Sequence, residues 1–174
     1  MLKNELGEIH YWNELAGNKM EKNPALLQTY TGLIGEEYQE LLDATLEYDV
    51  LDALADLVVV TVGAIHAMGH HADNLLEQVN NANFSKFCET EEEAQESVEA
   101  YLNDNRYINV RYESVGDYYI LRGDKVDGTA DNKILKSIYF TEPNYDNCGR
   151  INEKNTRRCG QKNFGAESLR VFFT

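Results

Sequence analysis

Apolar residues recur every three or four positions through the first half of the chain, which is the period of amphipathic α-helices. A first apolar stripe ends near Gly17 and consists of Leu2, Leu6, Ile9, Trp12 and Ala16. Asn23 followed by Pro24 is typical of a helix N-cap and first helical residue, so a second helix is expected over residues 24–47. The chain therefore begins with helices that each have one face to bury.

A third helix is expected from a cap at Asp49 to about Met68, where Gly69 ends it. It is apolar nearly all round, which predicts a buried central element. Four or five helices of one chain cover such a helix only in part. The pattern therefore predicts a homodimer or homotetramer assembled through the second and third helices.

Two further helices follow in the pattern. Asp73 is expected to cap a fourth, whose inward residues are Leu76, Val79 and Phe87. Thr90 and Glu93 match a capping box, which predicts a fifth helix over residues 91–103. The many glutamates of that helix are expected to form a solvated face.

After Asn105 the apolar period changes from helical spacing to two, which indicates β-strands. Alternating residues, a turn around Gly116 and a third apolar stretch predict a hairpin followed by a strand over residues 134–141. The chain is thus expected to be mainly α, a helical bundle with a small three-strand extension. We divide it into a helical catalytic domain at 1–104, a small antiparallel β extension at 105–145, and a basic, peripheral tail at 146–174.

The net charge and the cysteine content indicate which partners and which cellular compartment suit the protein. The net charge is -14 with a pI near 4.6, which disfavours nucleic acid as a partner. Three cysteines form no C-x-x-C pair, which is typical of reduced cytoplasmic thiols. The strongest apolar run, residues 57–65, is far shorter than the roughly 20 residues of a membrane span. We therefore expect a cytoplasmic protein without a membrane partner.

Polar residues interrupt the apolar face of the second helix. On a wheel of 100° per residue, Glu37 falls about 20° from Leu26, in the middle of that face. Glu40 lies at the edge of the face and Glu36 further round. A buried carboxylate needs a compensating cation. A structural salt bridge is one explanation for Glu37, although no lysine or arginine occurs between Lys22 and Lys86.

The third helix carries Asp52 and Asp56 four residues apart, so both lie on one face. Together with the second helix they form an oxygen-only donor set, which suits Mg²⁺ or, as a substitute, Mn²⁺. For Asp52 there is a purely structural alternative. If Asp49 caps the helix, Asp52 occupies the third helical position, where an acid favours the helix dipole.

The fourth helix is expected to direct Asn83 and Lys86 toward the core side. A lysine there suits a polyphosphate ligand, or it neutralises one buried glutamate. His66 is interpreted as a packed core histidine, whereas His70 and His71 are expected to be solvated loop residues. Two aromatic residues of the first helix are either core or a surface for a base, Tyr11 and Trp12.

These motifs resemble a known family. Residues 36–40 form an E-E-x-x-E helix, residues 52–57 resemble a second acidic helix, and residues 83–86 resemble an N-x-S-K segment. In this order they resemble the MazG-like, all-α nucleoside triphosphate pyrophosphatases and the related phosphoribosyl-ATP pyrophosphohydrolases. The family's second motif is usually E-x-x-D, whereas position 53 here is alanine and Asp52 stands in its place.

The resemblance implies Mg²⁺-dependent cleavage of a nucleoside triphosphate between its α and β phosphates by a helical bundle that a second subunit completes. The metal ligands are expected to be Glu37, Glu40, Asp52 and Asp56, with Glu36 as a further ligand or the base. Asn83 and Lys86 are expected to bind substrate. Two alternatives remain open: phosphoribosyl-ATP pyrophosphohydrolysis, and a non-catalytic helical binding or assembly module with a structural cation.

Overall fold

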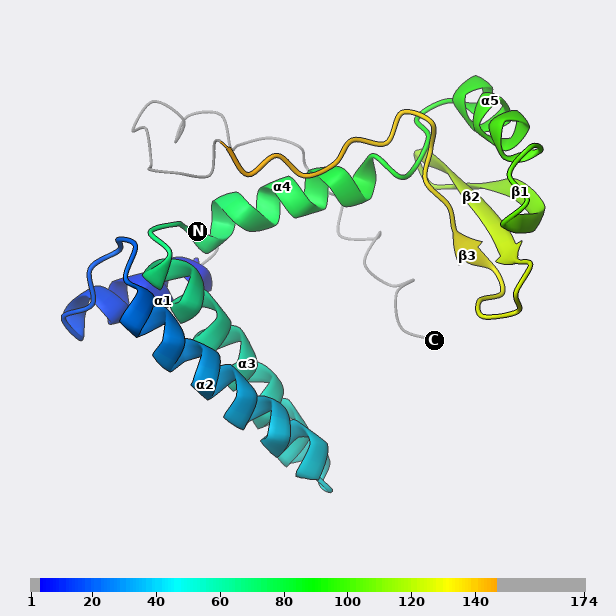
Figure 1. The fold of residues 1–174 in the computed structure, drawn as a ribbon. Helices are drawn as coiled ribbons and strands as arrows, with labels where there is room; N and C mark the ends of the chain where they lie inside the picture. Colours follow the sequence, from blue (N-terminus) through cyan, green and yellow to red (C-terminus); the bar gives the residue numbers. More distant parts are fainter. Residues whose placement is uncertain (1–3, 147–174) are drawn as a thin grey trace. The chain divides into compact units, whose positions relative to one another are not determined.

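The structure, a computed structural model, describes residues 4–146 and groups them in two compact units. The first comprises residues 4–78 with 144–146, and the second comprises residues 79–143. The described elements are five helices and one three-stranded antiparallel sheet, which confirms a mainly α chain with a small β extension. Figure 1 shows these elements along the chain.

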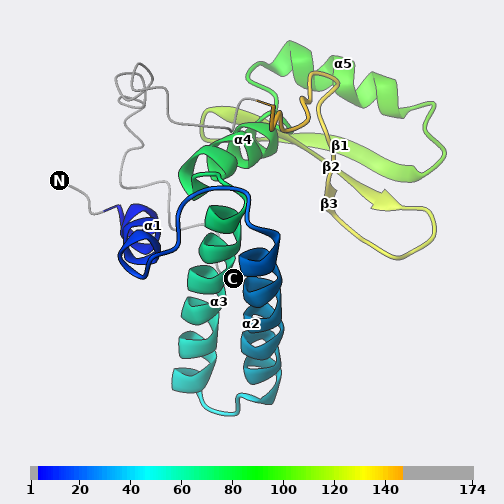
Figure 2. The same ribbon diagram turned by 60° about the vertical axis from the view of Figure 1, so that its left-hand side comes forward.

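The first unit is built on an antiparallel pair of helices, α2 (Pro24–Asp43) and α3 (Glu47–Ala67), which run side by side in Figures 1 and 2. The predicted cap of α2 is confirmed, because the Asn23 side chain accepts a hydrogen bond from the Leu26 amide. α1 (Glu5–Leu15) packs against α3. The next helix along the chain, α4 (Ala72–Phe84), begins in this unit and continues into the second.

Two predicted helix caps are wrong. α3 begins at Glu47, so Asp49 lies inside its first turn and the capping residue is Leu46, without a side-chain bond. Asp73 likewise lies in the first turn of α4 and instead accepts a hydrogen bond from the Asn4 side chain. Acids are favoured both at the cap and in the first turn, so residue type alone does not locate the boundary.

The ring of Tyr30, on α2, lies directly on Gly63 of α3. A Cβ at position 63 would overlap this ring. Tyr30 also donates a hydrogen bond through its hydroxyl to the Asn13 side chain of α1. One residue thus joins α1, α2 and α3, and it belongs to the core cluster with Val60 and Ala67.

The apolar circumference of α3 is only partly covered. Ala53, Val60 and Val62 are buried, but other large residues are 40–59% exposed: Leu51, Leu54, Val58 and Val59. Among residues 4–146 only α1 and α2 pack along α3, so the single chain covers this helix only in part, as the pattern predicted. By length and composition α3 also passes as a membrane span, a test that core helices of soluble proteins pass too.

The buried face of α1 is polar, contrary to the expected apolar stripe. Tyr11 and Trp12 are about three-fifths exposed and so are not core residues, whereas His10 and Asn13 are buried. The reason is a set of specific hydrogen bonds that these two polar side chains make to α2, α3 and α4. His66 is fully buried, as predicted, but His70 and His71 are half-buried rather than solvated, and the His71 ring contacts His10.

A relay of hydrogen bonds fixes the tautomers of the two buried histidines. The Ala72 amide donates to His10 Nε2 at 2.9 Å, so His10 Nδ1 carries the proton and donates to His66 Nδ1 at 3.0 Å. His66 Nε2 then donates to the Asn18 carbonyl at 2.9 Å. A second proton on His10 would have to bind Nε2, where its N–H would point at the N–H of Ala72. Burial, together with the nearby His71 and His66, lowers the pKa of His10 to about 4.

The second unit is a sheet covered on one face by a helix. α5 (Glu91–Tyr101) begins at the predicted Thr90 cap and packs on β1 (Tyr107–Val115) and β2 (Tyr118–Lys125), as Figure 2 shows. Gly116 provides the positive φ of the hairpin turn, which confirms the predicted hairpin. The core of this unit joins α5 to the sheet through Cys88, Ala94, Leu121 and Leu135.

Two details of the predicted strands are wrong. A bulge at Asn109, which has φ 54°, shifts the register of β1, so that Ile108 is exposed on one face while Val110 packs against the core on the other. β3 contains only Lys133–Ile134, not residues 134–141. The backbone amides that follow donate to several different elements, so no continuous ladder forms.

We expect Gly63→Ala to destabilise the protein by about 1–3 kcal/mol, because the added methyl group overlaps the Tyr30 ring. Gly35 on α2 is the control, since a Cβ there meets nothing within 4 Å. Gly35→Ala should be neutral or stabilising by up to about 1 kcal/mol. Thermal unfolding of the two variants checks this, and equal effects would contradict the close approach.

We expect the histidine relay to make stability pH-dependent. An unfolded histidine titrates near 6.5 and folded His10 near 4, so the unfolded chain binds the proton first. The contribution of His10 is complete above about pH 6.5 and is lost as pH falls toward 4. Melting curves of wild type and His10→Gln over this range test it: the difference between them should shrink with falling pH. A constant difference would rule out a neutral, buried His10.

Candidate active site

The packing register of the two long helices places Glu37 next to Asp56. Glu37 follows Tyr30 by seven residues, or about two turns, and Asp56 precedes Gly63 by the same number. Because the helices are antiparallel, the contact between Tyr30 and Gly63 brings the two carboxylates to the same level of the seam. Glu37 is half-buried there.

The electrostatics of Glu37 show that the predicted acids gather around it. Burial raises the pKa of the Glu37 carboxyl above its ordinary range, and four neighbouring carboxylates raise it further. In order of decreasing effect, these neighbours are Glu40, Asp56, Glu36 and Asp52. The other four predicted acids thus lie near enough to Glu37 to act on its charge.

Nothing in the described first unit neutralises this charge. The ion pairs formed by residues 4–146 all lie in the second unit. The sequence has no lysine or arginine between Lys22 and Lys86. A structural salt bridge within residues 4–78 therefore does not explain Glu37.

The alternative in which Asp52 only stabilises the dipole of α3 is wrong. Since α3 begins at Glu47, Asp49 takes the third helical position and Asp52 lies in the second turn. The effect of the helix dipole on acids is confined to the first turn. Asp52 therefore faces the acidic group without the stabilisation that its predicted position would have provided.

The acids are less inward than expected. Only Glu37 is half-buried, and four are exposed in the chain by itself: Glu36, Glu40, Asp52 and Asp56. Within residues 4–146, no three acidic, histidine or cysteine side chains converge closely enough to hold a metal ion. The donor chemistry nevertheless fits a hard divalent cation, because every group is a carboxylate.

The other two predicted site residues contact each other in the second unit. Lys86 lies in a turn beyond the end of α4 at Phe84, and its Nζ donates to Asn83 Oδ1 at 2.7 Å. Asn83 is exposed, so the expectation that both point toward the core is wrong for it. The pattern failed because Leu76, seven residues before Asn83 on the same face, is itself exposed, and because α4 ends at Phe84 before it reaches Phe87. Sequence reasoning assigned no role to Ser85, whose hydroxyl donates to the Ala82 carbonyl of α4.

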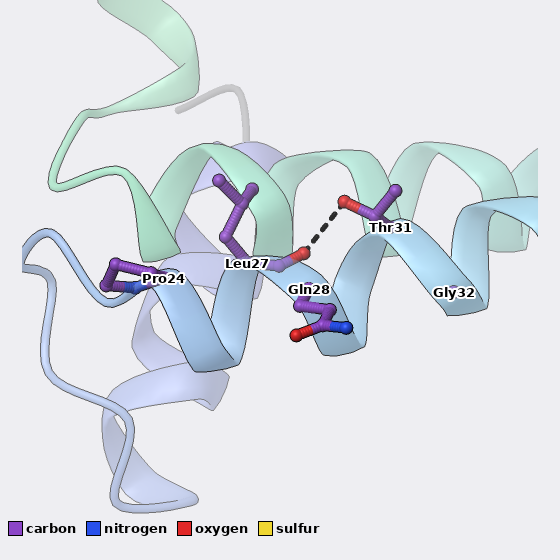
Figure 3. A pocket seen from close by; sticks show the side chains of 5 residues that line it. All are labelled: Pro24, Leu27, Gln28, Thr31 and Gly32. Atoms are coloured by element: carbon purple, nitrogen blue, oxygen red, sulfur yellow. Dashed lines mark hydrogen bonds between the residues drawn. The ribbon is translucent and has the colours of Figure 1, made fainter.

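A shallow pocket near the start of α2 is separate from these residues (Figure 3). In it the Thr31 hydroxyl donates to the Leu27 carbonyl at 2.8 Å. Its lining has no titratable group and consists of Pro24, Leu27, Gln28, Thr31 and Gly32. The pocket therefore offers no acid or base for catalysis.

Paired helices that carry carboxylates are the arrangement that the resemblance to the all-α nucleotide pyrophosphatases implies. Comparison with protein families agrees: residues 5–83 match the phosphoribosyl-ATP pyrophosphohydrolase (PRA-PH) family. This segment is a PRA-PH domain of the MazG-like all-α NTP pyrophosphatase superfamily. The match includes all five acids and ends at Asn83.

The matched family has a defined enzyme class. PRA-PH proteins are pyrophosphohydrolases, hydrolases that act on acid anhydrides, and the family is soluble. They are generally dependent on divalent cations. Comparison with curated proteins finds no match to the chain.

Proposed function

We propose that the protein is a Mg²⁺-dependent nucleoside triphosphate pyrophosphohydrolase. It cleaves a ribo- or deoxyribonucleoside triphosphate between the α and β phosphates and yields the monophosphate and pyrophosphate. The observation that carries this proposal is the group of four carboxylates around half-buried Glu37 on the paired helices of a PRA-PH domain. Such charge is costly for stability and suits a site that binds cations.

Glu37, Glu40, Asp52 and Asp56 would hold the cation, which Mn²⁺ can replace. When bound, a divalent cation offsets phosphate charge and lowers the pKa of coordinated water. Glu36 serves as a further ligand or as the base that takes a proton from the attacking water. The oxygen of water bonds to the α phosphorus, the bond to the bridging oxygen breaks, and pyrophosphate leaves with that oxygen.

Lys86 and Asn83 supply the substrate contacts in this proposal. The Lys86 ammonium has three donors, of which Asn83 takes one. Among residues 79–143, no carboxylate forms an ion pair with Lys86. Its charge is therefore not neutralised within its own unit and suits phosphate oxygens. Asn83 orients phosphate, sugar or base.

Phosphoribosyl-ATP is the second candidate substrate, because the matched family is named for its hydrolysis. We rank it lower because α5 and the sheet extend the chain beyond the matched segment, 5–83. The products distinguish the two candidates. A non-catalytic role for the carboxylates, with one structural cation, is the outcome if no nucleotide is cleaved.

Glu37→Gln should abolish pyrophosphate release from the best substrate in a panel of nucleotides that includes phosphoribosyl-ATP. Without metal the variant should be as stable as wild type or slightly more so, because one of five clustered charges is removed. A kinetic assay and circular dichroism check both parts. Activity within about tenfold of wild type would contradict a role as metal ligand. Asp43→Asn, an exposed acid at the end of α2 that does not act on Glu37, is the control.

We also propose a cytoplasmic homodimer or homotetramer that assembles through α2 and α3. The support is the exposed apolar surface of α3, where Leu54 and Val58 are about half exposed. A second copy would bury these residues and surround the acids with helices on more sides.

Light scattering should give a mass of at least two 19.9 kDa chains, and Leu54→Glu should reduce it. Leu102 is 74% exposed beyond the end of α5, so Leu102→Glu should leave the mass unchanged. A fully active wild-type monomer would contradict the shared bundle.

A further inference from the structure

The segment after β3, residues 135–141, lies along the turn that carries Lys86; we call it the strap. Its Ser137 amide donates to the Lys86 carbonyl at 3.0 Å. Its Thr141 amide donates to Ser85 Oγ at 3.0 Å. Two backbone donors of the strap therefore hold two consecutive residues of the turn.

The strap is itself fixed to the core of the second unit. Leu135 is buried, and its amide donates to the Leu121 carbonyl at 2.9 Å. The Ile138 amide donates to Oγ of fully buried Ser97 at 3.2 Å. Because these anchors belong to the sheet and α5, the position of the strap follows from the packing of the whole unit.

Ser85 connects the strap to the end of α4. Its hydroxyl donates its one proton to the Ala82 carbonyl at 2.9 Å, so its lone pairs are left to accept the Thr141 amide. The Thr141 hydroxyl also lies 3.3 Å from Ser85 Oγ. Loss of the Ser85 hydroxyl would remove both the helix contact and the strap contact.

The side chain of Lys86 depends on this turn. Its Nζ reaches Asn83 Oδ1 only while the turn holds residue 86 next to the last residues of α4. A flexible lysine loses rotational freedom when it binds a phosphate, and a prearranged turn reduces that loss. The PRA-PH match ends at Asn83, so Ser85 and the strap lie outside the matched segment.

We propose that the strap is a positioning element for polyphosphate binding. Through Ser85 and the Lys86 backbone, it holds Lys86 and Asn83 in the arrangement that contacts the phosphates of the substrate. Ser85 is a positioning residue, since it acts through Lys86. The inference rests on the proposed function in one respect, the assignment of Lys86 to phosphate.

A double-mutant cycle in the full chain tests the proposal, with inorganic tripolyphosphate and Mg²⁺ as the probe and calorimetry as the readout. Lys86→Ala should weaken binding by about tenfold or more, the effect of losing a charged hydrogen bond. Ser85→Ala should weaken it by about three- to fivefold in the wild-type background, and by under about 1.5-fold when Lys86 is already alanine. Ser85→Thr, which keeps the hydroxyl, should restore binding.

A second pair of variants tests the strap from its other side. Thr141→Pro removes the amide donor to Ser85, whereas Thr141→Ala keeps it. Only the proline variant should weaken tripolyphosphate binding, and the loss should again disappear in the Lys86→Ala background. This pair decides the matter if Ser85→Ala does not fold, which circular dichroism will show.

Three results would overturn the inference: no binding by wild type, unchanged binding by folded Ser85→Ala and Thr141→Pro, or losses that add fully to that of Lys86→Ala. An additive loss would mean that Ser85 acts independently of Lys86. Coupled losses in a protein that cleaves no nucleotide would support the positioning role while the proposed pyrophosphohydrolase activity fails.

Discussion

The contact of the Tyr30 ring with the bare backbone of Gly63 sets the register of the two long helices of the first unit. Two long helices can slide along each other, but a ring that fits only over a glycine allows one register. Two turns further along, that register pairs Glu37 with Asp56. The hydroxyl of the same tyrosine binds Asn13, so α1 is held by the residue that aligns the carboxylates.

The same seam shows a conflict between stability and function. Apolar residues fill it on the side of Tyr30 and Val60, and beyond them the pattern continues with carboxylates. Mutual repulsion and burial raise the pKa of Glu37, so the folded chain holds this charge at a cost. An apolar residue at position 37 would pack without this electrostatic cost, so packing alone does not account for the carboxylate. A functional role does account for it.

The second unit contains the other residues of the proposed site. Its core is small, but it orders α5, the sheet and the strap, and the buried hydroxyls of Ser97 and Ser137 accept backbone amides of the strap. The strap then holds the turn that presents Lys86. The PRA-PH domain contains the acids, while residues that follow it hold the backbone turn of Lys86.

The sequence by itself determined the helical class, the Asn23 cap, the hairpin at Gly116 and the anomaly at Glu37, because each depends on residues close together in the chain. It did not determine that Trp12 is exposed while His10 is buried, or that a bulge at Asn109 turns Ile108 outward. Those outcomes depend on hydrogen bonds and packing between distant segments. The same reason applies to the strap: residues 135–141 have the pattern of a strand, but their amides bond to α5, β2 and the turn after α4, and only the tertiary structure brings those partners within reach.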